Sequence, residues 1–377
     1  MSKNTLQYCA TDKEIYDALM SAKQKINEKV LLELAKDRGI FYSAKDSRDD
    51  LVSAISILPH DYHDLNTLLE QREHSGRQEK LTSVTLPAAL TVEGIREMLR
   101  EYIEESPEDE KVTQQVKDGN QVIANIKYSD IDYGKTRLVQ RTPKEASIEF
   151  HVSTDKTVIR MPANDRVKII YSKLKDRLDA KAKAEIPTIR IELGEFQSPA
   201  LRTEFFTSLI SNLKGFSLKN VTSVKVERLP PETEEDELEL DLDDDQEAEV
   251  AKEEALALVK NVALKGETLL ASEEYQSLTR KGFFITSIIW RSVLSKAPQP
   301  MVEFEAAFED PIQGKGFKYF VRGAYRVVEL LYTKTIRPVS AEDKETYLGI
   351  IEETAAKVIS ELRVQAQAGT ESKGKSV

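Results

Sequence analysis

The 377-residue sequence is poor in cysteine and histidine, with one Cys and four His. Because Cys9 has no second thiol to pair with, an intramolecular disulfide framework is excluded, which is typical of proteins in a reducing compartment. No apolar run is long enough to span a bilayer, and the first residues lack the apolar core of a secretory signal peptide. We therefore expect a cytoplasmic protein without membrane contact.

Common enzyme signatures are also missing. The sequence has no Gly-x-Gly-x-x-Gly, no Gly-x-Ser-x-Gly and no His-Glu-x-x-His. The triplet 134–136 reads Gly-Lys-Thr, but Ser129 stands where a phosphate-binding loop needs its first glycine. The sequence therefore favours a protein without catalytic activity and without a cofactor. A cryptic metal-dependent nuclease is the alternative, in which Asp130, Asp132 and Glu149 would assemble in space.

Negative charge is concentrated in one segment. The net charge is −11, and it becomes +1 when the twelve carboxylates between Glu232 and Glu249 are left out. A near-neutral remainder can carry basic faces, so the overall acidity does not exclude a nucleic-acid partner. The segment predicts an extended, solvated stretch, and its alternating leucines also suit a peptide that lies in a basic groove. We expect it to regulate binding.

Residues 1–60 predict a set of short helices. Thr11 and Glu14 form a capping-box pattern in front of an apolar stripe. A further helix ends near Gly39, and Ser47 has the character of an N-cap for the next one. The stretch between them is polar and predicts a loop.

The residues around this loop share the pattern of a family of small helical modules. They are Leu31, Leu34, Gly39, Ile40, Ser47, Arg48, Leu51, Val52 and Ile55. Over residues 28–58 this pattern resembles the helix–extended loop–helix group, which includes SAP and LEM domains. The resemblance implies binding of DNA or a DNA-associated protein through the loop and the following helix N-terminus. Candidate nucleic-acid contacts are Arg38, Lys45, Ser47 and Arg48. The alternative is a docking or dimerisation module with a solvated loop.

Three histidines follow this module. A helix would place His60, His63 and His74 along one side, which is compatible with a metal site. A surface helix explains the same residues, and no cysteine supports a site, so we predict that no metal is bound. If a metal ion were bound, these three histidines would be the candidate ligands.

The stretch from Gln121 to Ala184 predicts three strands followed by a helix. A strand over 187–196, a helix and another strand follow it. Lys168 and Lys175 flank the apolar stripe of the helix over 165–184. They form either a phosphate-binding surface or a solvated face around the core.

Residues 251–294 predict a long helical region with a deeply buried part from Phe283 onward. Two strands around a turn at 310–314 and a helix over 341–362 follow. This order echoes the one at 121–184, which suggests two pseudo-repeated sheet-and-helix halves.

The strand predicted after the turn at 310–314 alternates aromatic and cationic residues. At its start, Lys315, Gly316, Phe317 and Tyr319 resemble the RNP1 motif of RNA-recognition domains. This resemblance implies base stacking together with phosphate contacts. Lys315, Lys318 and Arg322 are the candidate contacts. The alternative is a strand whose aromatic side chains form a core face.

The sequence thus predicts an α+β fold, in which a helical module precedes a mixed or antiparallel sheet with packed helices. The predicted divisions are a SAP/LEM-like module at 1–75, a charged connector with one helix at 76–117, an α+β core at 118–230, an acidic flexible segment at 231–250, a helical and β second half at 251–366, and a disordered tail at 367–377. We expect a non-enzymatic nucleic-acid-binding or nucleic-acid-associated adaptor. Its partner would be DNA, RNA, or a protein that contacts the N-terminal module or the acidic segment. Oligomerisation is left open, and a scaffold without nucleic acid is a further alternative.

Overall fold

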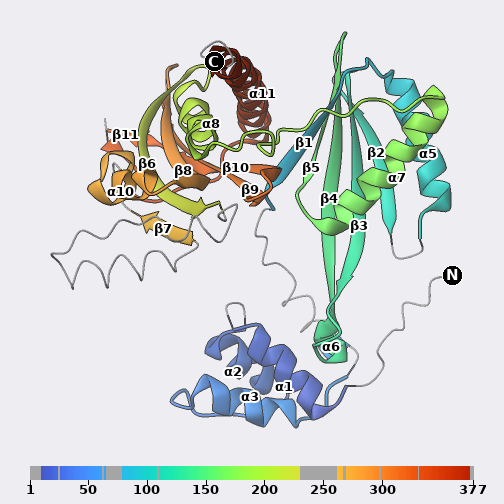
Figure 1. The fold of residues 1–377 in the computed structure, drawn as a ribbon. Helices are drawn as coiled ribbons and strands as arrows, with labels where there is room; N and C mark the ends of the chain where they lie inside the picture. Colours follow the sequence, from blue (N-terminus) through green and yellow to red (C-terminus); the bar gives the residue numbers. More distant parts are fainter. Residues whose placement is uncertain are drawn as a thin grey trace, which may run out of the picture. The chain divides into compact units, whose positions relative to one another are not determined.

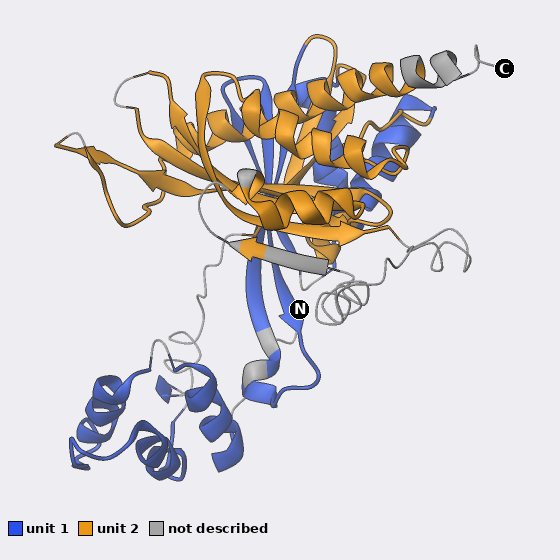
Figure 2. Cartoon of the chain, turned by 60° about the vertical axis from the view of Figure 1, so that its left-hand side comes forward, with its two compact units in different colours: residues 1–78, 90–153, 169–184 blue, residues 79–89, 154–168, 185–377 orange. Residues whose placement is uncertain are grey.

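The computed structural model describes residues 10–23, 26–61, 63–64, 79–107, 110–229, 261–265, 269–296, 299–329 and 331–373 (Figure 1). The acidic segment, Cys9 and His74 lie outside the described residues. The chain divides into two compact units, each assembled from separate stretches (Figure 2). Unit 1 comprises residues 1–78, 90–153 and 169–184, and unit 2 comprises 79–89, 154–168 and 185–377. The domain boundaries predicted near residues 117 and 250 do not coincide with any position at which the chain passes from one unit to the other.

Unit 1 begins with a three-helix module: α1 (Asp12–Ser21), α2 (Glu28–Lys36) and α3 (Arg48–Ser56). The predicted capping box is present, since Thr11 accepts from the Glu14 N–H and the Glu14 carboxylate accepts from the Thr11 N–H. Asn27 caps α2 by accepting from the Val30 N–H, and Ser47 caps α3 by accepting from the Asp50 N–H. Apolar residues of all three helices form one small core.

The rest of unit 1 is a three-stranded antiparallel sheet with three helices. The elements are α5 (Val92–Glu105), β2 (Lys111–Lys117), β3 (Gln121–Ile131), α6 (Arg137–Gln140), β4 (Arg141–Val152) and the part of α7 (Asp165–Ala182) from residue 169 onward. The strand order is β2-β3-β4. Figure 1 shows α5 and α7 beside this sheet, and both bury their apolar stripes. At the end of the β3–β4 hairpin, Leu138 of α6 joins the core of the helical module.

Unit 2 contains an antiparallel sheet with strand order β5-β1-β10-β9-β8-β6-β7. The strands are β1 (Leu81–Leu86), β5 (Thr157–Pro162), β6 (Phe216–Arg228), β7 (Asn261–Lys265), β8 (Phe283–Leu294), β9 (Met301–Asp310) and β10 (Lys315–Tyr325). A separate hairpin is formed by β11 (Val327–Val328) and β12 (Leu331–Tyr332). Strands β1 and β5 come from early in the chain, yet β1 pairs with β10 through Leu81 and Tyr319.

Two helices cover the main core of unit 2. They are α8 (Pro199–Ser211) and α11 (Ala341–Lys373), which pack against each other and against the sheet (Figure 1). The fully buried Trp290 and Phe304 stack in this core with ring centroids 5.4 Å apart. The short helix η2 (Leu269–Ala271) and α10 (Glu273–Arg280) add to the same core.

The structure confirms the α+β class and corrects several local predictions. Residues 283–294 form strand β8, not the buried part of a helical region. The strand predicted over 187–196 is absent apart from one bridge between Thr85 and Ile189. Helix α11 runs to Lys373, past residue 367 where the tail was predicted to begin. The pseudo-repeat stays a prediction. No helix in the described part of the chain has the length and apolar character of a membrane span.

Candidate nucleic-acid interface

The loop between α2 and α3, residues 37–47, is held in a defined conformation. Gly39 follows α2 with φ of +73°, a conformation that favours glycine. The next N–H, that of Ile40, donates to the carbonyl of Ala35 at 3.0 Å. Ile40 and Tyr42 pack against the core of the module. The loop backbone is therefore anchored on both sides of Phe41.

Phe41 itself points to solvent. Its exposed fraction is 79%, while its two neighbours are half-buried. Further along the loop, the N–H of Ser43 donates to Asp46 at 3.0 Å, which fixes the turn that presents Lys45. Lys45 is exposed, and its ammonium group has no ion pair among the described residues. The loop thus presents one aromatic ring and one cation.

The N-terminus of α3 already carries negative charge. The Ser47 hydroxyl accepts from the Asp50 N–H at 3.2 Å and donates to the Asp50 carboxylate at 2.6 Å. Asp49 and Asp50 both lie in the first helical turn and are exposed. These carboxylates interact favourably with the positive end of the helix and would repel a phosphate group. Ser47 therefore acts as a helix cap.

Arg38 and His60 form a polar cluster instead of an open cationic surface. Arg38 bonds to Asp64 at 2.6 Å and to His60 Nδ1 at 3.0 Å. The other ring nitrogen of His60 lies 2.9 Å from the Ile55 carbonyl. Burial first, and then the Arg38 charge, lower the pKa of His60, which favours the neutral imidazole.

The histidines do not assemble into a metal centre in the described ranges. Both ring nitrogens of His60 have protein partners, and His63 also has a partner. No group of three His, Cys, Asp or Glu suited to a metal ion occurs among the described residues.

Arg48 is buried, with an exposed fraction of 7%. Its Nη2 donates to the Leu19 carbonyl at 2.6 Å, and its Nε donates to the Ile26 carbonyl at 3.1 Å. These bonds tie the start of α3 to the end of α1 and to the turn before α2. The guanidinium satisfies backbone carbonyls and is not presented to a ligand.

In unit 2, Lys168 and Lys318 lie in one charged neighbourhood. Lys168 bonds to Glu309 at 2.7 Å. Burial alone would lower the pKa of Lys168, but this carboxylate outweighs the burial and raises it. Lys318 is half-buried, and burial followed by the nearby Lys80 cation lowers its pKa. Lys168 is thus neutralised within the protein.

Arg322 and Lys175 are also neutralised by acids. Arg322 bonds to Glu303 at 2.9 Å and to Glu305 at 2.8 Å. In unit 1, Lys175 pairs with Asp179 one turn along α7 at 2.6 Å. Phe317 and Tyr319, the aromatic residues at the start of β10, are core residues, 3% and 0% exposed. They are therefore unavailable for base stacking.

The carboxylates of the nuclease alternative do not come together. In the β3–β4 register, Glu149 is opposite Ile123 while Asp130 is opposite Thr142, at the other end of the hairpin. Asp130 and Asp132 each have a lysine partner. A metal ion held jointly by Asp130 and Glu149 is therefore excluded by the register.

Of the predicted contacts, Lys45, Lys315 and Lys318 have no carboxylate bonded to the ammonium group among the described residues. Phe41 was not predicted as a contact, because an aromatic residue between two apolar neighbours is typical of a core position. The one signal against a core position was its place between Ile40 and Tyr42, since successive side chains of an extended segment point to opposite sides. Comparisons with known proteins give no further indication, since no family model and no curated protein sequence matches the chain.

Proposed function

We propose that this protein is a non-enzymatic nucleic-acid-binding or nucleic-acid-associated adaptor, and that its contact site is the α2–α3 loop. One observation carries this: Phe41 is 79% exposed on a loop whose two flanking side chains are packed into the module. The proposal also draws on the resemblance of residues 28–58 to SAP and LEM modules, which implies a contact through this loop.

The ring of Phe41 suits stacking on an unpaired base. Aromatic side chains that stack on bases typically contribute about 1–3 kcal/mol per base and tolerate any sequence. The anchored backbone means that little conformational freedom is lost when the ring is covered. Lys45, four residues away and without an ion pair in the described structure, would meet a neighbouring phosphate. Single-stranded nucleic acid is therefore the partner that these two side chains fit.

The test is anisotropy titration of the intact chain with labelled single-stranded DNA and RNA over a range of salt concentrations. Phe41→Ala should weaken binding about tenfold at every salt concentration, because stacking is insensitive to ions. Lys45→Gln should weaken binding most at low salt and should reduce the salt slope by about one phosphate contact.

Ile57→Ala is the matched control, because Ile57 is a large apolar side chain of the same module and is 67% exposed. Its affinity should equal that of the unaltered chain. Equal affinities for Phe41→Ala and the unaltered chain would rule out the loop as the contact. Deletion of residues 232–249 tests the regulatory role expected for the acidic segment, and it should raise the affinity at low salt.

A protein scaffold is the second candidate, and the acids of α3 favour it. Asp49 and Asp50 are exposed in the first turn of the helix that follows the loop. An aromatic residue beside carboxylates suits a protein partner with an apolar pocket and a basic rim. Absence of DNA and RNA binding at the lowest salt concentration, with the acidic segment deleted, would favour this function over the first.

A further inference from the structure

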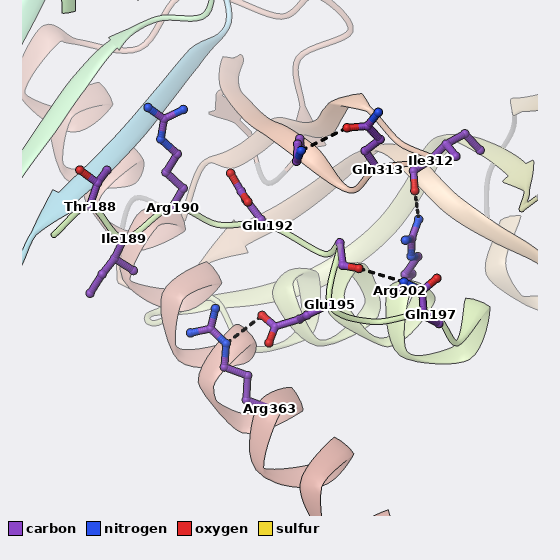
Figure 3. A pocket seen from close by; sticks show the side chains of 12 residues that line it. Thr188, Ile189, Arg190, Glu192, Glu195, Gln197, Arg202, Ile312, Gln313 and Arg363 are labelled. Carbon is purple, nitrogen blue, oxygen red and sulfur yellow. Dashed lines mark hydrogen bonds and ion pairs between the residues drawn. The ribbon is translucent and has the colours of Figure 1, made fainter. Parts of the chain in front are cut away.

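A pocket of about 700 Å³ lies within unit 2 (Figure 3). Residues 188–197 and the turn at 312–315 form two of its walls, and Arg202 of α8 and Arg363 of α11 complete the lining. Rim residues such as Lys315 are exposed, so the pocket opens to solvent. Its volume is in the range of sites for small organic ligands.

Close backbone contacts hold the two walls together. The Leu193 N–H donates to the Gly314 carbonyl at 2.7 Å. A Cβ at Gly194 would lie 2.7 Å from the Gln313 carbonyl oxygen, and one at Gly314 would lie 2.6 Å from the nitrogen of Gly194. Gly314 also has φ of +64°. The walls can meet in this way only because glycine occupies both positions.

Arg202 ties the same two walls together from beneath. Its side chain is 1% exposed. Its Nε donates to the Phe196 carbonyl at 2.7 Å, and its Nη1 donates to the carbonyls of Pro311 and Ile312, both at 2.8 Å. One lining residue of the pocket is therefore a guanidinium whose position is fixed by three backbone acceptors.

The charge of this guanidinium is not balanced by a bonded carboxylate within the described residues. Its Nη2 has no hydrogen-bond acceptor in this part of the chain, and its remaining contact is the Phe284 ring, 5.0 Å from the guanidinium carbon. Burial lowers the pKa of Arg202, and only the more distant Asp310 opposes this effect. Because an arginine stays protonated in proteins, a buried and unpaired guanidinium is stabilised by an anion that enters the pocket.

The surroundings also favour an anion. The charged residues that line the pocket are four cations and two carboxylates: Arg190, Arg202, Lys315, Arg363, Glu192 and Glu195. Arg363 is paired with Glu195 at 2.8 Å, and Arg190 also has an interaction of its own. Among the residues that the structure describes, the ammonium group of Lys315 bonds only to the amide oxygen of Gln313, at 3.2 Å. Figure 3 shows the contact between Arg363 and Glu195.

The first turn of α8 adds a further positive contribution. This helix has 13 residues, and its N-cap Ser198 makes no side-chain cap hydrogen bond. Proline follows at the first helical position, so the free N–H groups of the turn begin one residue later. Uncapped N–H groups at a helix N-terminus favour negative charge nearby.

We propose that this pocket binds the phosphate monoester group of a small organic molecule about the size of a nucleoside monophosphate, with Arg202 and Lys315 as the phosphate contacts. Nη2 of Arg202, the guanidinium nitrogen that is not bonded to a backbone carbonyl, can donate to a phosphate oxygen, and the dianion matches the excess of two positive charges in the lining. Ile189 and Ile312, which are 49% and 36% exposed, provide apolar surface for the organic part. This site shares no residue with the α2–α3 loop.

The test is isothermal titration calorimetry on the full chain with AMP, adenosine and inorganic phosphate as probes. AMP should bind with an affinity that falls as salt rises, and adenosine should bind at least tenfold more weakly, because it lacks the charged group. Short oligonucleotides with a 5′-phosphate and a 5′-hydroxyl identify the source of the monoester. Preference for the phosphorylated oligonucleotide over AMP would assign the site to a nucleic-acid end, and the reverse would assign it to a free small molecule.

Lys315→Glu is the informative variant, because this side chain is exposed and substitution of an exposed side chain usually changes stability little. It should weaken AMP binding about tenfold or more. Lys214→Glu is the matched control, an equal charge reversal at an exposed position of the same unit outside the pocket, and its affinity should be unchanged. Arg202→Lys keeps the charge and loses the Nη2 donor, so it should also weaken AMP binding, provided that the melting temperature of the variant is unchanged.

Two results would overturn this site. One is no heat and no thermal stabilisation with millimolar AMP at low salt. The other is an equal loss of affinity in Lys315→Glu and Lys214→Glu, which would show that any binding follows overall charge and not the pocket. Neither result depends on Phe41 or Lys45, so failure here leaves the function proposed for the loop unaffected.

Discussion

Replacement of Glu352 should strongly destabilise unit 2, because this carboxylate balances a buried cation. Glu352 accepts two hydrogen bonds from Arg160, Nε to Oε1 at 2.6 Å and Nη2 to Oε2 at 3.0 Å. It also accepts a hydrogen bond from the hydroxyl of Tyr319. Arg160 and Tyr319 are 4% and 0% exposed, so neither can turn to water for a replacement partner. The three residues join β5, β10 and α11.

The size of the effect follows from what Glu352→Ala leaves behind. Removal of one partner from a buried ion pair typically costs about 3–5 kcal/mol, because the remaining charge stays desolvated. A domain of the size of unit 2 melts about 2–4 °C lower for each kcal/mol lost. Calorimetric melting of the intact chain should therefore show its unit 2 transition lowered by roughly 6–20 °C.

Two further variants separate this cause from a general effect of altering α11. Lys357→Ala breaks an exposed pair with Glu361, at 3.6 Å on the same helix, and should change the stability by less than about 0.5 kcal/mol. The combination Arg160→Met, Glu352→Leu and Tyr319→Phe removes the charges and the hydroxyl together, and it should recover most of the loss. A loss below about 1 kcal/mol in Glu352→Ala, or no recovery in the combined variant, would refute the assignment.

Two other predictions concern single side chains. Arg48→Met should destabilise the helical module by about 2–3 kcal/mol, because the carbonyls of Leu19 and Ile26 lose a charged donor. Amide hydrogen exchange should therefore accelerate in α1, while exchange in β9 of unit 2 should not change. Burial alone would raise the pKa of Glu305, but the bonded cations of Lys80 and Arg322 outweigh the burial and lower it below its ordinary value. A carboxyl whose pKa is lower in the folded state than in the unfolded chain adds stability that is complete above the ordinary pKa and is lost as pH falls through the folded pKa. Urea unfolding should therefore show a steeper loss of stability on acidification for the unaltered chain than for Glu305→Gln, and equal slopes would contradict this.

Much of the fold follows from local patterns in the sequence. The capping box of Thr11 and Glu14, the cap at Ser47 and the apolar stripe of α5 are short-range signals, and all three are present in the structure. The hairpin of β9 and β10 was predicted from two strand-like runs around a turn. These elements depend mainly on residues close in sequence.

The failures concern residues whose environment is set by distant parts of the chain. Strand β8 begins with four successive buried residues, because both of its faces are covered there, so the alternation that identifies a strand is missing. Arg48 and Arg202 resemble surface cations in the sequence, yet both are buried against backbone carbonyls. The pocket was not predictable, since its walls meet only through tertiary contacts of Gly194 and Gly314.

The interleaved course of the chain has a consequence for biosynthesis. Strand β1 emerges from the ribosome early, but its partner β10 is made only after most of the chain, and α11 follows later still. Until then, β1 and β5 have each other but lack the remaining strands and the covering helix, and such exposed edges invite wrong pairing between nascent chains. A ribosome that stalls before β10 would therefore release a product that is prone to aggregate. The helical module differs, because its three helices have all been made by residue 58 and it then lacks only the contact with α6.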